Sequence, residues 1–269
     1  MNCPVCQSCT SLAFKALVLF KYDAEYQVCP LCGYLFTAEP HWLDEAYATA
    51  IASTDTGLVK RNISISAKLA CLLYFGMGER GHGRYVDLAG GYGMLTRMMR
   101  DCGFNFFWED KYCSNLLAQG FEFNRDDGAC SAVTAFEVLE HVPDPLEFIK
   151  KALKDASAEN IIFSTVLYDG APPDPAKWWY YGFSNGQHIG FFQKKTLEVI
   201  GQKLDLNLLS TNGIHVLSKS RASETLVKIV TQPLMSRIGA HYVRNRLSSK
   251  TQADRDFLLS ELVSRSRLG

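Results

Sequence analysis

A cluster of glycines directly follows a short apolar run, and this arrangement constrains the fold more than any other feature of the chain. The segment reads Tyr-Val-Asp87-Leu-Ala89-Gly90-Gly91-Tyr-Gly93. We expect a strand that ends in a tight turn with little side-chain bulk and continues into a helix. Such a turn lets a nucleotide-like ligand approach the backbone and the helix N-terminus closely. The same pattern also precedes a dinucleotide or no ligand, so the turn alone does not identify a cofactor.

From residue 84 onward, short apolar runs alternate with amphipathic stretches. This alternation is typical of a parallel sheet with crossover helices, so we expect a doubly wound α/β fold. One helix start is marked clearly, because Asp144 suits an N-cap and Pro145 suits the first helical position. The expected strands are 85–89, 105–108, 131–136 and 161–166, helices are expected over 93–100, 144–153 and 197–204, and a closing hairpin over 206–209 and 214–218.

An acid at the end of the second expected strand adds to the glycine turn. Asp110 lies nineteen residues after Gly91. A carboxylate at this place can accept hydrogen bonds from both hydroxyls of a ribose. Glu109 is adjacent and competes for the role, and a surface acid without a ligand is the plainer interpretation.

Two segments resemble class I methyltransferases that use S-adenosylmethionine (SAM). The segment from Val86 to Gly93 is similar to motif I of that family, although Ala89 stands where the family usually has its first glycine. The segment Thr134-Ala-Phe136-Glu137-Val-Leu-Glu140-His141-Val-Pro-Asp-Pro is similar to the one that follows the fourth strand in these enzymes. A dinucleotide site more often keeps the complete G-x-G-x-x-G pattern, which is not present here.

The resemblance covers about residues 84–220 and implies a Rossmann-like, mostly parallel sheet of seven strands. The implied strand order is 3-2-1-4-5-7-6, with the last strand antiparallel. The resemblance also implies SAM as the cofactor. Its implied binding residues are Asp87, Ala89, Gly90, Gly91, Gly93 and Asp110, with Phe136 and Glu137 lining the pocket.

Two C-x-x-C pairs near the N-terminus indicate a metal site. Cys3 and Cys6 are separated from Cys29 and Cys32 by 22 residues, a spacing typical of tetrahedral Cys₄ zinc. Four thiolates leave no open coordination position, so we expect a structural site within a small zinc-binding module. Cys9 repeats the same spacing and is a further candidate. Similar N-terminal zinc modules occur in some sugar methyltransferases.

Aromatic residues and one histidine gather after the fifth expected strand, in the segment 178–192. In this fold the acceptor binds above the carboxyl ends of the strands, where such loops project. We expect His188 to act as the general base, with Tyr180 or Tyr181 assisting it or shaping the pocket. A hydrogen-bonded structural histidine is an equally good interpretation, and His141 is the second candidate for the base.

Composition sets limits on the remaining possibilities. Lys and Arg total 28 and Asp and Glu total 28, so a balanced charge argues against nucleic acid and membrane partners. We find no secretory signal and no apolar stretch of about 20 residues that could span a bilayer, and therefore expect a cytoplasmic protein. The expected segments are a zinc-binding module over 1–40, a helical lid or linker over 41–82, the methyltransferase domain over 83–220 and a helical tail over 221–269.

These observations predict an enzyme that transfers a methyl group from SAM to a small polar acceptor, such as a sugar or a sugar nucleotide. Two alternatives stay open. One is an RNA-modifying methyltransferase that grips RNA with the zinc module and the basic tail. The other is a non-catalytic scaffold with a degenerate methyltransferase fold, for which Ala89 is the sole support. The acceptor atom and the oligomeric state are not encoded in any motif.

Overall fold

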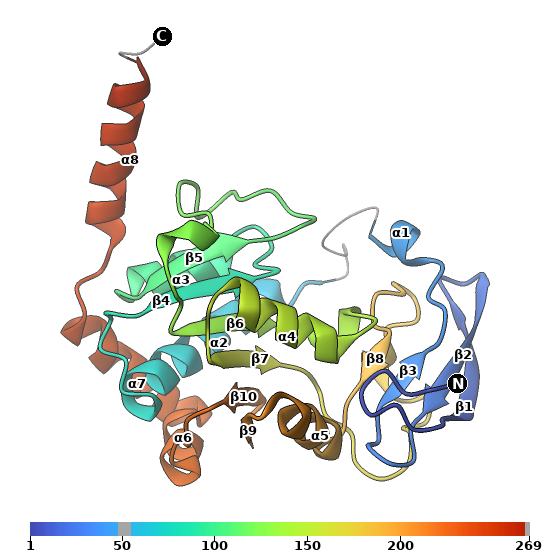
Figure 1. The fold of residues 1–269 in the computed structure, drawn as a ribbon. Coiled ribbons are helices and arrows are strands. Elements are labelled where there is room, and N and C mark those ends of the chain that lie inside the picture. The colour runs from blue at the N-terminus through green and yellow to red at the C-terminus, as the bar shows by residue number, and fades with distance from the viewer. Residues whose placement is uncertain (48–54, 267–269) are drawn as a thin grey trace. The chain divides into compact units, whose positions relative to one another are not determined.

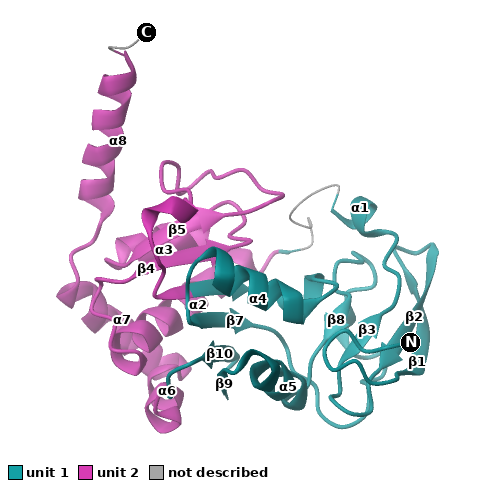
Figure 2. Cartoon of the chain, viewed as in Figure 1, with its two compact units in different colours: residues 1–55, 133–221 teal, residues 56–132, 222–269 magenta. Residues whose placement is uncertain are grey.

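The computed structural model describes residues 1–47 and 55–266, and its chain divides into two compact units (Figures 1 and 2). The first unit comprises residues 1–55 and 133–221. The second unit comprises residues 56–132 and 222–269. Each unit is therefore assembled from two separate segments of the sequence.

A mostly parallel sheet confirms the expected α/β fold. Strands β4 and β5 pair in parallel within the second unit, and β6 and β7 pair in parallel within the first. Strand β10 is antiparallel to both β7 and β9. The strand order is β5-β4-β6-β7-β10-β9. The bounds are β4 Arg84–Leu88, β5 Asn105–Glu109, β6 Ala132–Phe136, β7 Asn160–Ser164, β9 Asn207–Thr211 and β10 Ile214–Ser218.

The predicted seven-stranded order 3-2-1-4-5-7-6 is not matched, because this sheet has six strands within the described residues. Next to β5 the chain forms an isolated parallel bridge between Trp108 and Glu122 in place of a further strand. Trp108 N donates to Phe121 O at 2.8 Å, and Phe123 N donates to Trp108 O at 2.8 Å. Asn124 then accepts from a backbone N–H two residues ahead and starts a 3-10 turn, which ends the pairing.

Local sequence signals explain the helices and the hairpin of the first unit. Helix α4 (Pro145–Asp155) begins as predicted, since Asp144 accepts a hydrogen bond from Glu147 N at 2.9 Å. Helix α5 (Lys194–Leu204) starts with a capping box between Gln193 and Thr196. The hairpin of β9 and β10 turns at Asn212-Gly213, where both residues have positive φ.

A second, four-stranded sheet lies wholly in the first unit, and its β1-β2 hairpin lies between the two cysteine pairs. Its order is β1-β2-β3-β8, and every pairing is antiparallel. Aromatic side chains such as Tyr26, Tyr181 and Phe191 form a buried core against it. The bounds are β1 Ser11–Val18, β2 Tyr22–Val28, β3 Leu35–Thr37 and β8 Gly190–Phe191.

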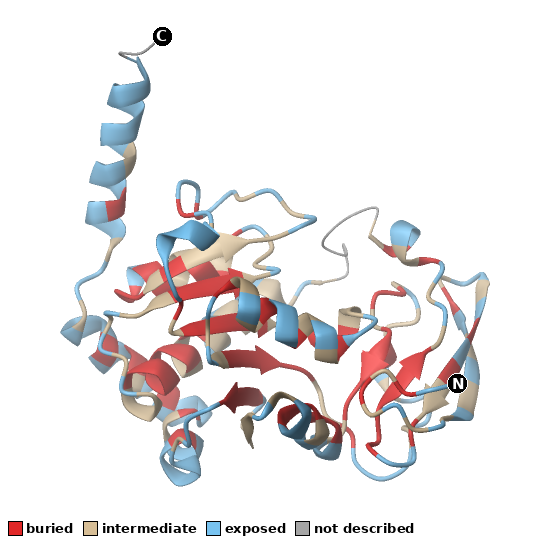
Figure 3. Ribbon diagram, viewed as in Figure 1, coloured by how far each residue is buried: buried red, intermediate tan, exposed pale blue. Residues whose placement is uncertain are grey.

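The remaining helices belong mainly to the second unit. Strands β6 and β7 are buried in Figure 3, whereas α8 is exposed along most of its length. Among the described residues, no helix combines the length and the apolar character that a bilayer span requires. The bounds are α1 Leu43–Ala46 in the first unit, and α2 Leu58–Cys71, α3 Met94–Asp101, α6 Glu224–Val230, α7 Pro233–Arg246 and α8 Thr251–Ser266 in the second.

A buried ion pair anchors the first turn of α8 to α3. Arg100 Nε and Nη2 donate to the two carboxylate oxygens of Asp254 at 2.8 and 2.6 Å. The side chains are only 5% and 7% exposed, and Arg97 adds a third contact to Asp254 at 2.8 Å. Burial alone would raise the pKa of Asp254, but the two guanidinium groups together hold it below its ordinary value.

Replacing Asp254 with Ala should lower the free energy of unfolding by about 3 kcal/mol, because Arg100 then keeps a buried charge without its partner. The control Asp256→Ala lies two residues further on an exposed part of α8 and should have no measurable effect. Urea denaturation measures both. Because the pKa of Asp254 is lowered in the folded state, its contribution is present above its ordinary value of 3.8 and lost as the pH falls below it. Equal stability of the two variants would contradict the anchoring role.

Candidate functional site

The glycine turn after β4 adopts the geometry that a close ligand approach requires. Ala89, Gly91 and Gly93 have φ values of 52°, 55° and 86°, so the backbone is left-handed at three of five consecutive residues. A Cβ at Gly91 would meet no atom within 4 Å, whereas one at Gly90 would come within 2.9 Å of the Trp108 ring. The turn is thus packed on one side and open beside Gly91. The N-terminus of α3, capped by Gly93, follows directly.

Asp110 closes the same turn from the end of β5. Gly91 N donates to Asp110 Oδ2 at 2.9 Å, and Tyr112 N and Cys113 N donate to Oδ1 at 2.7 and 2.8 Å. These three bonds fix the carboxylate next to the bare peptide. Oδ1 already accepts two hydrogen bonds, but Oδ2 accepts only one and can accept a further hydrogen bond from a ligand. Such an arrangement suits a hydroxyl of a ribose.

The other acids near this turn have different partners. Glu109, which competes with Asp110 in the sequence, forms an ion pair with Arg125 at 2.9 Å. Asp87 is 2% exposed and accepts a hydrogen bond from Thr96 Oγ1 at 3.4 Å. The second unit therefore gathers six of the predicted cofactor residues around one turn: Asp87, Ala89, Gly90, Gly91, Gly93 and Asp110.

Phe136 and Glu137, the other two predicted cofactor residues, belong to the first unit at the carboxyl end of β6. Glu137 has a φ of 56°, which is unusual for a residue with a side chain. Ser164, the last residue of β7, secures it from both directions. Ser164 Oγ donates to Glu137 Oε1 at 2.6 Å and accepts from Glu137 N at 3.0 Å.

Glu140 lies at the centre of a buried polar cluster in the first unit. Its side chain has no solvent exposure, and Oε1 accepts a hydrogen bond from Tyr180 OH at 2.7 Å. Oε2 has no hydrogen-bond partner among the described residues. Burial, with a smaller contribution from the charge of Glu137, raises the pKa of Glu140 to about 8. The same burial, with the nearby charge of Glu140, raises the pKa of Tyr180, so its phenol stays protonated.

Two histidines complete this cluster. The rings of His141 and His188 lie 4.8 Å apart and nearly perpendicular. His188 Nδ1 lies 2.6 Å from Tyr180 O, and a carbonyl can only accept, so Nδ1 carries a proton, which leaves Nε2 with the lone pair whenever the ring is neutral. His141 Nδ1 lies 2.9 Å from Tyr47 OH and 3.1 Å from Gln187 O. Burial, and then the proximity of His188, lower the pKa of His141 to about 3, so this imidazole is neutral near pH 7.

The predicted catalytic residues do not all share one environment. Tyr180, His141 and His188 are in contact around Glu140. The hydroxyl of Tyr181 instead donates to Pro173 O at 2.9 Å, and its ring packs in the aromatic core. Sequence reasoning included Glu140 in a motif without assigning it chemistry. Its position beside His141 was the available signal, whereas no pattern pointed to Tyr47.

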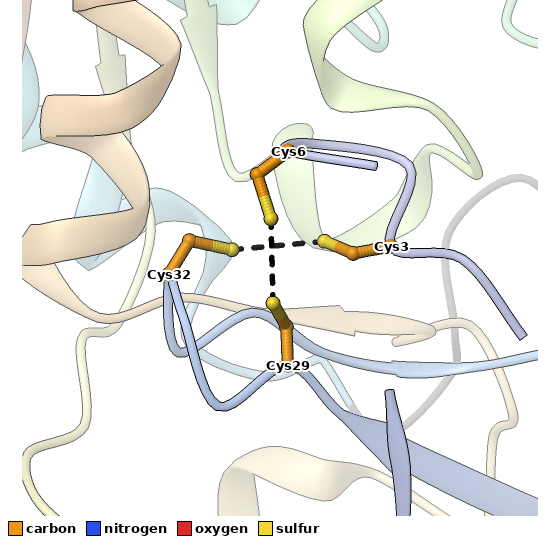
Figure 4. A group of neighbouring side chains, drawn as sticks. All are labelled: Cys3, Cys6, Cys29 and Cys32. Carbon is orange, nitrogen blue, oxygen red and sulfur yellow. Dashed lines mark hydrogen bonds between the residues drawn. The ribbon is translucent and has the colours of Figure 1, made fainter. Parts of the chain in front are cut away.

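The four cysteines of the two C-x-x-C pairs converge in the first unit (Figure 4). Cys3 Sγ lies 3.6 Å from Cys32 Sγ, and Cys6 Sγ lies 3.4 Å from Cys29 Sγ. Sulfurs about 2.3 Å from a tetrahedral zinc ion are separated by roughly 3.8 Å, so the four thiols fit this ion. The hydrogen bond with Cys32 lowers the pKa of the Cys3 thiol to about 5, which favours a thiolate. Cys9 is exposed and lies outside the group.

Glu140, His141 and His188 form a second group of possible metal ligands. One ligand atom from each lies within 4.8 Å of the others. A carboxylate and two imidazoles can bind a divalent transition metal, and the same atoms can also accept protons. The geometry of the group is compatible with either use.

A protein-family model described as a methyltransferase domain matches residues 64–211, which is more than half of the chain. No curated protein matches the sequence. An O-methyltransferase family 2 protein from Planctomyces limnophilus, solved in complex with apigenin, is 14% identical with a TM-score of 0.46. The similarity covers 66% of this chain and 65% of that one.

Two other solved structures are similar to the chain at low identity. A methyltransferase of calicheamicin biosynthesis with bound S-adenosylhomocysteine is 12% identical, with a TM-score of 0.44 and coverage of 65% of this chain and 60% of that one. A magnesium protoporphyrin IX methyltransferase from Synechocystis is 13% identical, with a TM-score of 0.40 and coverage of 68% and 93%. The similarity thus spans less than two thirds of the apigenin-bound and calicheamicin proteins.

Replacing Ala89 with Gly should stabilise the protein slightly. An L-residue in the left-handed region is disfavoured by about 1 to 2 kcal/mol, which exceeds the roughly 0.5 to 1 kcal/mol of extra chain entropy that glycine loses on folding. Urea denaturation should therefore show a gain of about 0.5 kcal/mol. The control Ala152→Gly, within α4, should lose about 1 kcal/mol. A loss at both positions would show that the turn does not strain Ala89.

Proposed function

Because this chain belongs to the methyltransferase-domain family, we propose that it uses SAM to methylate a small polar acceptor, such as a sugar or a sugar nucleotide. The observation that carries the proposal is the buried cluster of Glu140, His141, Tyr180 and His188. Carboxylate, imidazole and phenol groups together suit an acceptor that offers hydroxyl or amine donors. An apolar acceptor would offer no donor to Glu140 Oε2, the buried oxygen of this cluster that has no hydrogen-bond partner among the described residues.

The cofactor is proposed to bind at the glycine turn of the second unit. Asp110 Oδ2 would accept a hydrogen bond from a ribose hydroxyl, and the backbone beside Gly91 would admit the amino-acid end of SAM. The hydrogen bond between Gly91 N and Asp110 supports this arrangement, since it joins the two binding elements at 2.9 Å. Phe136 and Glu137, which belong to the first unit, stay predictions from the family resemblance.

The base is proposed to be His188. SAM supplies a methyl group made electrophilic by its positively charged sulfur. In its neutral form, the imidazole of His188 would take the acceptor's proton at Nε2 while the acceptor bonds to the methyl carbon, the methyl–sulfur bond breaks and S-adenosylhomocysteine leaves. The bond between Nδ1 and Tyr180 O fixes the tautomer that this step needs. The backbone carbonyl of Tyr180 would stabilise the resulting imidazolium by accepting from Nδ1, and His141 is the second candidate for the base.

The four-cysteine group is proposed to bind one zinc ion with a structural role. Four sulfurs would fill the tetrahedral shell and leave no place for a substrate. The close approach of the thiols supports this proposal. The family match favours neither the RNA-modifying enzyme nor the non-catalytic scaffold.

Replacing Asp110 with Asn should weaken the binding of S-adenosylhomocysteine by about ten- to a hundredfold, since charged hydrogen bonds are worth about 1.5 to 3 kcal/mol. The neighbouring variant Glu109→Gln is the matched control and should change the affinity less than about twofold. Titration calorimetry measures both, and thermal denaturation confirms that each variant is folded. A larger loss of affinity in Glu109→Gln than in Asp110→Asn would show that Glu109 makes the ribose contact instead.

His188→Ala should reduce turnover by about a hundredfold or more, as expected for the loss of a general base, while the affinity for S-adenosylhomocysteine stays unchanged. Release of S-adenosylhomocysteine can be measured over a panel of free sugars, nucleotide-linked sugars, phenols and amines. His41→Ala, an exposed histidine of the first unit, is the control. If turnover persists in His188→Ala and is lost in His141→Ala, His141 is the base and His188 is not.

Purified protein should contain one zinc ion per chain by elemental mass spectrometry. The double variant Cys3→Ser and Cys6→Ser should lose it, because two of four ligands are then absent. Cys9→Ser should retain the ion, since Cys9 is exposed and outside the group. A second equivalent of metal that disappears in His188→Ala would instead place an ion between Glu140, His141 and His188, and would remove His188 from the role of base.

A further inference from the structure

The strand that leaves the four-cysteine group pairs with the strand that follows the proposed base. Strand β3 begins at Leu35, three residues after Cys32. Strand β8 begins at Gly190, two residues after His188. The antiparallel register joins Leu35 to Phe191, next to Gly190. Segments about 150 residues apart in the sequence thereby become one piece of backbone structure.

Ile189, the neighbour of His188, is held by its backbone on two sides. Ile189 N donates to Glu140 O at 2.7 Å, and Ile189 O accepts from Thr37 N at 3.0 Å. One bond therefore leads to the polar cluster and the other to the end of β3. A displacement of β3 would move the peptide that carries His188.

The second C-x-x-C turn is itself fastened to the rest of the first unit. Gly33 N donates to Cys29 O at 2.9 Å, which closes the turn. Thr196 Oγ1 donates to Cys32 O at 2.8 Å, and Tyr168 OH donates to Gly33 O at 2.5 Å. Both of these side chains are buried or nearly so, so the turn is part of the core.

Between the second C-x-x-C turn and His188, the side chains are tightly packed. Tyr34 is 1% exposed, and its ring stacks on Phe36 with centroids 5.2 Å apart. The hydroxyl of Tyr34 lies against Gly190, where an added Cβ would come within 2.4 Å of it. A side chain at position 190 would therefore push β8 away from β3.

We propose that the four-cysteine group is a positioning device for His188. Metal binding fixes the C-x-x-C turn, the turn fixes β3, and β3 fixes β8 and the backbone on either side of Ile189. The glycine turn and Asp110, which are proposed to bind SAM, are held by contacts within the second unit, such as those of Gly91 with Asp110 and Trp108. Loss of the metal should consequently disable the acceptor side while SAM binding persists. The catalytic meaning of this inference rests on the proposed function of His188, although the structural link does not.

The test measures the reactivity of each histidine toward diethylpyrocarbonate by mass spectrometry, which needs no acceptor. Removing zinc with a chelator should increase modification of His188 and His141 at least tenfold. His82 and His241, both exposed in the second unit, provide the reference rate, and buried His215 should stay protected. Calorimetry with S-adenosylhomocysteine should show less than a twofold change. Cys32→Ser should behave like the chelated protein, and Cys9→Ser like the untreated one.

Gly190→Ala tests the same link with the metal still bound. Zinc content should be normal, and His188 should become as reactive as in the chelated protein. Adding Tyr34→Phe removes the hydroxyl that the new Cβ would meet and should restore part of the protection. Protection of His188 that survives both chelation and Gly190→Ala would overturn the proposal. The proposal would also be overturned if chelation abolished both the protection of His188 and the binding of S-adenosylhomocysteine, since the metal would then support the whole fold.

The modification experiment and the turnover experiment can fail independently of each other. If His188 proves not to be the base, His188→Ala retains turnover, yet the modification experiment still reports whether the metal orders the peptide at Ile189. If the link fails, His188 stays protected without zinc, and the turnover experiment is unaffected.

Discussion

The parallel register of β4 and β5 is the constraint on which the cofactor side depends. It places Leu88 opposite Glu109, so both strands end at the same edge of the sheet. The residues that follow, a glycine turn after one strand and Asp110 after the other, therefore meet without any long side chain to bridge them. The hydrogen bond from Gly91 N to Asp110 is the direct result. A shift of the register by one residue would separate the bare peptide from the carboxylate.

The acceptor side obeys a different constraint, which is the cost of burying polar groups. Glu140 is completely buried, and only one of its oxygens has a hydrogen-bond partner among the described residues. Such a carboxyl group destabilises the fold unless it stays protonated, binds a ligand or pairs with a cation. Its raised pKa is the first of these responses. A core selected for stability alone would place an apolar side chain here, so the cluster is consistent with retention for chemistry.

Local features of this fold could be predicted from the sequence, and non-local pairings could not. Asp144-Pro145 marks the start of α4, and Asn212-Gly213 marks the hairpin, because each signal acts within a few residues. Strand β8 has two residues and no periodicity, and its pairing with β3 gives it its structure. The absent seventh strand has a related cause. The chain beside Trp108 contains apolar residues, but a turn starting at Asn124 interrupts the ladder after one bridge.

The predicted cofactor residues and the proposed acceptor residues also differ in how local their sequence signals are. Six of the predicted cofactor residues lie from Asp87 to Asp110, within one strand-turn-helix-strand unit, so their spacing alone indicates their proximity. The acceptor cluster draws on Tyr47, Glu140 and His188, which the fold alone brings together. Aromatic composition pointed to the loop that carries Tyr180 and His188, but not to Glu140, which the fold brings into contact with Tyr180. Changes in the loops that carry these residues can alter the acceptor cluster without disturbing the glycine turn, which is why a methyltransferase sequence reveals its cofactor more readily than its substrate.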